Sequence, residues 1–122
     1  MNLEELIEKQ WSDYADRHRN RTNLLIHIVT VPVVWIGAFQ FLAGLFLLLL
    51  GVPGAFGMLF WAAVLIGVAL FAQARGNAME SKPPVAVADP AERAKRIVVE
   101  QFINFPRFVL TGDWLRNLKG AA

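Results

Sequence analysis

The sequence contains no cysteine, and it leaves a long central stretch without charge. The lack of cysteine excludes disulfides, thiolate metal sites and cysteine nucleophiles. Residues 22–74 contain no Asp, Glu, Lys or Arg, so the 12 basic and 10 acidic residues lie in the two flanks. A helix of a soluble protein needs one polar face, whereas a membrane span does not. The uncharged stretch therefore predicts an integral membrane protein.

The net charge is also small, and histidine is rare. The formal net charge is only +2 and basic residues alternate with acidic ones, so nothing indicates a nucleic-acid partner. Residues 1–21 carry several acidic side chains and no apolar run, which is not typical of a signal peptide. The 2 histidines are too few for the histidine clusters of di-iron membrane oxygenases.

Two apolar stretches, residues 24–50 and residues 55–74, have the length of membrane spans. A hydrocarbon core of ~30 Å requires ~20 residues of helix. Residues 51–57, between them, are rich in glycine and contain a proline, as is typical of a turn. We therefore expect an all-α, two-span hairpin. Pro32 should kink the first span because proline clashes with the preceding helical turn.

A kink at Pro32 divides the first stretch into a leading segment, residues 24–31, and a main span, residues 33–50. The leading segment would hold His27 near the membrane interface. In the second span, Ala63 and Gly67 form a small-xxx-small pair of the kind that permits close helix approach.

The two flanks complete a single domain. Residues 1–21 have the spacing of an amphipathic helix. Residues 75–122 indicate a linker followed by interfacial helices that begin at Asp89-Pro90, a good helix start. Basic residues adjoin the spans on both flanks and are missing from the hairpin turn. The positive-inside rule therefore predicts cytoplasmic termini, in the inner membrane if the protein is bacterial.

The 2 histidines occupy suggestive positions. His18 follows Tyr14 by four residues and His27 follows Asn23 by four, so each pair shares a helix face. A bend between them would bring the imidazoles together. Alternatively, His18 is a surface residue and His27 bonds a backbone carbonyl. A histidine within an apolar segment is costly, however, and this favours a functional role.

Glu80 follows the second span, so the hairpin returns it to the side of the membrane where the histidines lie. Two histidines and one carboxylate are the ligand set of non-haem Fe(II) oxygenases. The alternative is a solvated Glu80 near Lys82. The spacing selects neither iron over zinc nor metal over no metal.

Two motifs make the sequence familiar. They are Tyr14-x-x-x-His18-x-Asn20-x-Thr22-Asn23-x-x-x-His27-x-x-x-x-Pro32 and Glu100-Gln101-Phe102-x-x-Phe105-Pro106-Arg107-Phe108-Val109-Leu110-x-Gly112-x-Trp114. Together they span nearly the whole chain. The sequence resembles the small membrane family that includes the fungal 2-hydroxy-fatty-acid dioxygenase of the endoplasmic reticulum.

The resemblance implies Fe(II)-dependent oxidation of a 2-hydroxy fatty acid to a chain one carbon shorter. His18 and His27 match the first two family histidines, but Asn77 occupies the position of the third. Neutral asparagine is a poor Fe(II) ligand beside imidazole. On this hypothesis His18, His27 and Glu80 hold the iron, while Tyr14 and Asn23 orient the imidazoles.

Two alternatives remain open at the level of sequence. The first is a non-catalytic or degenerate member of that family, which binds lipid or a partner membrane helix. The second is a soluble helical protein whose uncharged stretch forms a buried hairpin.

Overall fold

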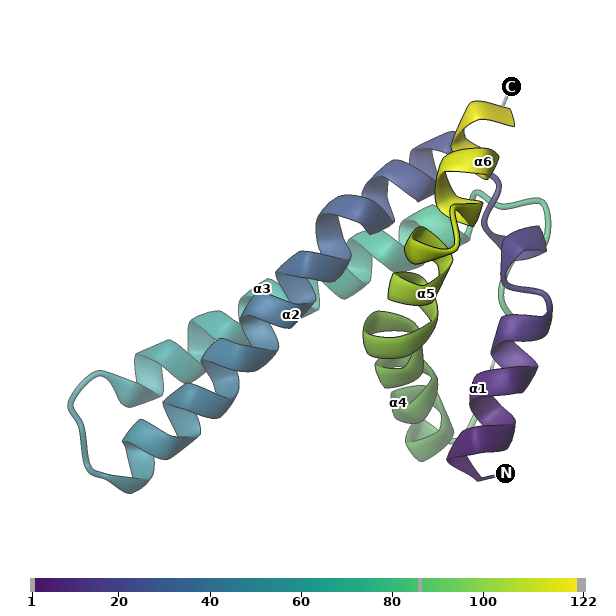
Figure 1. Cartoon of the computed structure of the whole chain (residues 1–122). Helices are drawn as coiled ribbons and strands as arrows, with labels where there is room; N and C mark the ends of the chain where they lie inside the picture. Colours follow the sequence, from purple (N-terminus) through teal and green to yellow (C-terminus); the bar gives the residue numbers. More distant parts are fainter. Residues whose placement is uncertain (1, 86, 121–122) are drawn as a thin grey trace.

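The computed structural model describes residues 2–85 and 87–120, which form helices joined by short turns and, between Asn77 and Pro90, by a longer connection (Figure 1). Ala86, in the expected linker, lies outside the described residues. The elements are α1 (Leu3–Ser12), the 3-10 turn η1 (Ala15–Arg17), α2 (Arg21–Leu49), α3 (Ala55–Asn77), α4 (Pro90–Val99), the π-helical turn η2 (Glu100–Asn104), α5 (Phe105–Leu110) and α6 (Asp113–Gly120). The predicted all-helical architecture is confirmed.

Helices α2 and α3 form a long antiparallel arm, and the other helices gather at the end of this arm that lies away from the turn (Figure 1). Both helices are long and apolar enough to cross a membrane. Their large apolar side chains point mostly outward, including Leu49 at 86% exposure and Phe39 at 76%. Such a continuous apolar surface is not suited to water.

Small residues set the closest approach of α2 to α3. A Cβ atom at Gly37 would meet Ile66, and a Cβ atom at Gly44 would meet Leu59. The prediction for Ala63 and Gly67 was wrong, because Ala63 is exposed and a Cβ atom at Gly67 would meet nothing. The two residues sit on the outer face of α3.

The N-terminal flank is not one continuous helix. Helix α1 ends at Ser12, whose hydroxyl donates to the Lys9 carbonyl at 2.8 Å. Such local bonding by Ser and Asp competes with helix continuation. The chain then makes the 3-10 turn and leaves His18 in a non-helical conformation with φ −132° and ψ 68°. This break turns the segment that carries His18 toward α2.

Helix α2 runs without interruption from Arg21 through Pro32 to Leu49, so His27 belongs to the long helix itself. The expected division into a leading segment and a main span is not seen as a break. Asn20 caps the helix, as its side chain accepts from the Asn23 N–H at 3.1 Å. This cap fixes where α2 begins, one helical turn or more before His27.

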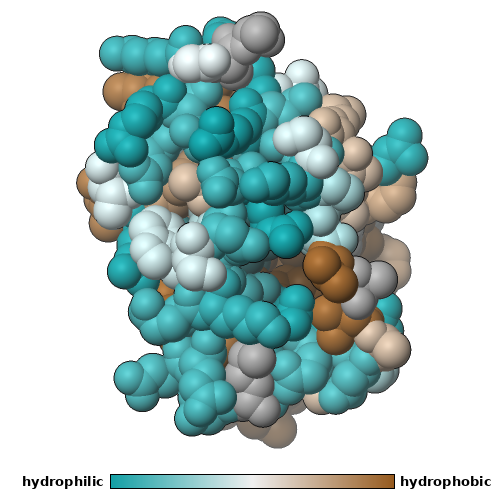
Figure 2. Space-filling view, turned by 90° about the vertical axis from the view of Figure 1, so that its right-hand side faces the viewer, coloured by the Kyte–Doolittle hydropathy of each residue, from teal (hydrophilic) through white to brown (hydrophobic). Residues whose placement is uncertain are grey.

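The C-terminal helices are fastened to the hairpin by side-chain hydrogen bonds. Asp89 caps α4, as expected, by accepting from the Ala91 N–H at 3.1 Å. Trp35 Nε1 donates to the Gln101 carbonyl at 2.7 Å, and the Gln73 and Gln101 amides donate to each other at 3.0 and 2.6 Å. The face turned away from the hairpin tip is mainly hydrophilic (Figure 2). The molecule therefore has one apolar arm and one polar end.

Candidate metal centre

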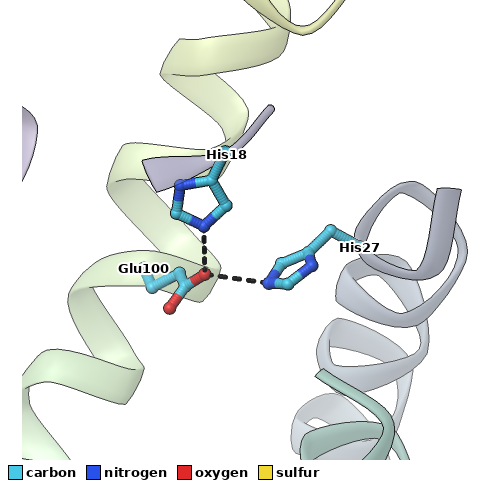
Figure 3. Close-up of side chains that lie close together, drawn as sticks. All are labelled: His18, His27 and Glu100. Atoms are coloured by element: carbon cyan, nitrogen blue, oxygen red, sulfur yellow. Dashed lines mark hydrogen bonds and ion pairs between the residues drawn. The ribbon is translucent and has the colours of Figure 1, made fainter. Parts of the chain in front are cut away.

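Three side chains from separate elements converge at the polar end of the hairpin (Figure 3). His18 follows the 3-10 turn, His27 lies on α2 and Glu100 begins the π-helical turn. One nitrogen of each histidine and one carboxylate oxygen all lie within 4.8 Å of one another. His27 is fully buried, His18 is 7% exposed, and the Glu100 side chain is 21% exposed. The group could hold a metal ion.

Both imidazoles are oriented by backbone carbonyls. His18 Nδ1 lies 2.8 Å from the Tyr14 carbonyl, and His27 Nδ1 lies 3.0 Å from the Asn23 carbonyl. A carbonyl oxygen only accepts, so each Nδ1 carries the hydrogen and donates it. In a neutral ring the lone pair is then on Nε2, the atom that binds metals in this arrangement. The i, i+4 spacing seen in the sequence produces both bonds.

Both Nε2 atoms point at the same carboxylate oxygen. Glu100 Oε1 lies 3.0 Å from His27 Nε2 and 3.5 Å from His18 Nε2, which has no hydrogen-bond partner. Lone pairs facing a carboxylate require a proton or a cation between them. Two ligand atoms ~2.1 Å from one ion lie ~3.0 Å apart at right angles and ~3.4 Å apart at the tetrahedral angle. The two separations from Glu100 Oε1 therefore fit a shared ion, while the histidine nitrogens lie within 4.8 Å of each other.

The charge on Glu100 is stabilised in place. Burial by itself would raise the pKa of its carboxyl, but the adjacent His18 and His27 imidazoles together hold that pKa well below its ordinary value. Burial first, and the Glu100 charge second, raise the pKa of Tyr14 well above 10.0. Tyr14 therefore keeps its proton and donates to Glu100 Oε1 at 3.3 Å.

Tyr14 also fixes the plane of the His18 ring. The two rings stack with centroids 3.8 Å apart and planes 13° apart. Phe108, fully buried, meets the edge of Tyr14 at 5.0 Å and closes the aromatic layer. The predicted positioning role of Tyr14 thus has a physical basis, through stacking and through its bond to Glu100.

The structure does not bring Glu80 to the imidazoles. Its carboxylate accepts from the backbone N–H groups of Arg19 and Asn20 at 2.9 and 3.0 Å, and from the Asn23 amide at 2.6 Å. These hydrogen bonds hold the Glu80 carboxylate at the N-terminus of α2, where the helix dipole stabilises a negative charge. Glu80 therefore anchors the turn after His18 to the end of α3, and Glu100 supplies the carboxylate beside the histidines.

The Asn23 side chain lies on the Glu80 side of α2, and only its backbone carbonyl contacts His27. Its amide also donates to Asn77 Oδ1 at 3.3 Å. A Cβ atom at Gly76 would collide with Asn23 Oδ1, so glycine is needed where α3 passes this side chain. Asn77 itself lines a cavity that His18 and Glu100 also line. Asn77, which has no histidine side chain to offer, thus shares this cavity with two members of the metal-binding group.

The sequence carried a weak signal for Glu100 as a ligand, although it was not among the predicted ligands. Glu100, Gln101 and Asn104 are polar residues within an otherwise apolar run from Ile97 to Phe105. In the structure, Gln101 and Asn104 are buried and the run takes a π-helical turn. Such turns are rare and occur frequently at functional sites. Here the turn places Glu100 and Gln101 toward different partners on the hairpin.

Comparison with known proteins gives no assignment: no family model, curated protein or solved structure matches the chain.

Proposed function

We propose that the protein is a membrane-anchored, Fe(II)-dependent dioxygenase that acts on 2-hydroxy fatty acids, with His18, His27 and Glu100 as the iron ligands. One observation carries the proposal: two imidazoles with carbonyl-fixed tautomers direct their Nε2 atoms at one carboxylate oxygen of Glu100. Two histidines and one carboxylate leave positions open for oxygen and substrate. The reaction itself is proposed from the resemblance of the two sequence motifs.

The hairpin would cross the membrane with both flanks on the cytoplasmic side. Its outer surface is apolar along both helices, while the charged residues lie at the end that carries the histidines. Basic residues adjoin the spans on that side alone, which favours cytoplasmic retention. A fatty acyl chain would then lie beside apolar helices with its polar end near the candidate centre.

The proposed reaction balances with oxygen as the oxidant. The bond between C1 and C2 of the 2-hydroxy acid breaks, C1 leaves as carbon dioxide and C2 becomes the new carboxyl carbon. Oxygen accepts four electrons: one oxygen atom enters the organic acid and the other is recovered as water. Iron, when bound, would supply coordination sites and electrons. Tyr14, through its bond to Glu100 and its stacking on His18, would hold both ligands in place.

The direct test is iron content and oxygen uptake of the purified protein after anaerobic loading with Fe(II). We expect about one iron per chain and oxygen consumption with 2-hydroxypalmitate. Glu100→Gln should lose both, while Glu92→Gln on the preceding helix, whose partner is Lys95, should lose neither. Protein that retains no iron and consumes no oxygen would contradict the proposal.

A specific observation supports a second candidate, a non-catalytic family member that binds lipid or a partner helix. Glu100 Oε1 already has the Tyr14 hydroxyl and the two imidazoles as neighbours, so a proton on His27 would satisfy the cluster without metal. Asn77→His discriminates between the candidates. If it creates iron binding that the natural chain lacks, the second candidate is favoured; if the natural chain already binds iron, the first is.

A further inference from the structure

A cavity of about 250 Å³ opens directly onto the candidate metal centre. Its floor includes Tyr14, His18 and Glu100, and its walls come from α1, α4, the end of α3 and the segment after it. The remaining lining residues are Lys9, Gln10, Asp13, Arg17, Asn77, Pro84, Val85 and Arg96. The metal-binding group is thus reached from the polar side of the molecule.

The basic residues of this cavity are unequally engaged. The Arg17 guanidinium already has partners, because it donates to the Asp13 carboxylate at 2.7 Å and to the Pro83 carbonyl at 2.7 Å. Neither Lys9 nor Arg96 forms an ion pair with any carboxylate in the part of the chain that the structure describes. Since Arg17 neutralises Asp13, the two positive charges of Lys9 and Arg96 face one remaining negative charge in the lining, that of Glu100.

Buried polar atoms without partners concentrate in the same cavity. Within residues 2–85 and 87–120 six such side-chain atoms occur, and three of them belong to its lining: Gln10 Oε1, His18 Nε2 and Arg96 Nε. Arg96 precedes Glu100 by one helical turn, but the Glu100 carboxylate is directed to the histidines. Buried polar groups are normally paired, so unpaired ones beside a cavity point to a ligand.

We propose that Arg96 and Lys9, with the Gln10 amide, form an anion-binding subsite that holds the carboxylate of an acyl ligand next to His18 and Glu100. The planar guanidinium pairs with a planar carboxylate through two parallel hydrogen bonds. A dianionic phosphate is disfavoured because the Glu100 carboxylate forms part of the same cavity. The inference rests on the proposed function only in taking the ligand to be an acyl acid; anion binding here does not require the metal.

The test compares octanoate with octanol, which have the same chain length, by calorimetry on the metal-free protein in lipid nanodiscs. Empty nanodiscs serve as the blank. We expect octanoate to bind at least about tenfold more tightly than octanol, as befits a hydrogen-bonded charge. Arg96→Gln should abolish this preference and Arg96→Lys should reduce it. Arg93→Gln, an exposed position on the same helix, should leave it unchanged.

Three results would overturn the subsite. They are equal binding of octanoate and octanol, an equal loss in the Arg93 and Arg96 variants, and tighter binding of octyl phosphate than of octanoate. If acetate displaced octanoate at the concentrations at which octanoate binds, the inference that the ligand is an acyl acid would be overturned. His27→Ala, which removes a metal ligand that does not line the cavity, should keep the octanoate preference while metal is lost, so failure of the subsite and failure of the metal centre are distinguishable.

Discussion

The two ends of the hairpin are held together by different kinds of contact. Near the turn, α2 and α3 touch through small and apolar residues, with Gly44 against Leu59, and Gln40 adds one hydrogen bond to the Met58 carbonyl. At the other end the two helices meet through hydrogen bonds: the Asn23 amide donates to Asn77 Oδ1 at 3.3 Å, and the Gln73 amide donates to the Thr30 hydroxyl at 3.0 Å. Only the second end has to fix the positions of chemical groups.

This contrast indicates where the sequence is constrained. Apolar packing between the two long helices tolerates many residue choices of similar volume. A buried hydrogen bond requires both partners, because the partner left behind carries the cost of desolvation. Substitutions should therefore have larger and more specific effects at the polar end than at the tip.

The largest effect is expected for His27→Ala. The ring is fully buried and Nε2 lies 3.0 Å from Glu100. Loss of a residue that only orients a ligand costs about 10- to 100-fold in metal affinity, so removing a ligand should cost more than about 100-fold. Competition with a metal chelator measures this loss of metal affinity. His27→Ala protein that still holds metal with the natural affinity would rule out the assigned ligand set.

Gly76→Ala should be next, because the new methyl group would collide with Asn23 Oδ1. We expect about 1–3 kcal/mol of destabilisation, typical of overpacking. Gly67→Ala is the matched control on the same helix, and a change within about 0.5 kcal/mol is expected because its site is open. Unfolding midpoints in mixed detergent–SDS micelles compare them. Equal effects would remove the distinction between the two regions.

The glutamine pair gives a sharper comparison. Gln73→Leu and Gln101→Leu should each cost roughly 1–3 kcal/mol, because each removes the partner of buried amide atoms on the other glutamine. In Gln101→Leu, Gln73 Nε2 keeps its bond to the Thr30 hydroxyl. The double variant should cost less than the sum of the two. Gln40→Leu near the tip removes only one bond to a carbonyl and should cost under about 1.5 kcal/mol. Additive costs at the polar end would contradict the pairing.

The smallest effect concerns acid stability of the metal-free protein. The folded pKa of Glu100 lies below its unfolded value of about 4.3. Its contribution to stability is therefore present above that value and is lost as the pH falls toward the folded pKa. The difference in unfolding midpoint between the natural chain and Glu100→Gln should shrink as the pH falls below about 4.3. A difference that grows on acidification would reverse the assigned shift.

Much of the fold could be predicted because it follows from local chemistry. The two apolar stretches, the glycine-rich turn and the Asp89 cap each act within a few residues of chain. The packing face of α3 could not be predicted in this way. Small residues occur all around that helix, and only its contacts with α2 select Ala62 and Ala69 over Ala63 and Gly67.

The candidate centre divides along the same line. His18 and His27 could be found because they are the 2 histidines of the chain, they follow Tyr14 and Asn23 by four residues, and His27 lies within an apolar segment. Their carboxylate could not, because Glu80 and Glu100 both lie on the correct side of the hairpin. The two carboxylates differ in the donors around them. The backbone N–H groups at the start of α2 bind Glu80. The bonds of Trp35 and Gln73 to Gln101 hold the π-helical turn in the position where Glu100 contacts the histidines.

Periodicity and hydropathy are local properties of the chain. The sequence by itself therefore predicted the two long apolar helices, the turn between them and the two histidines as candidate ligands. The acid that completes the group was selected by folding alone, because that choice depends on contacts between His27 and Glu100 across 73 residues of chain.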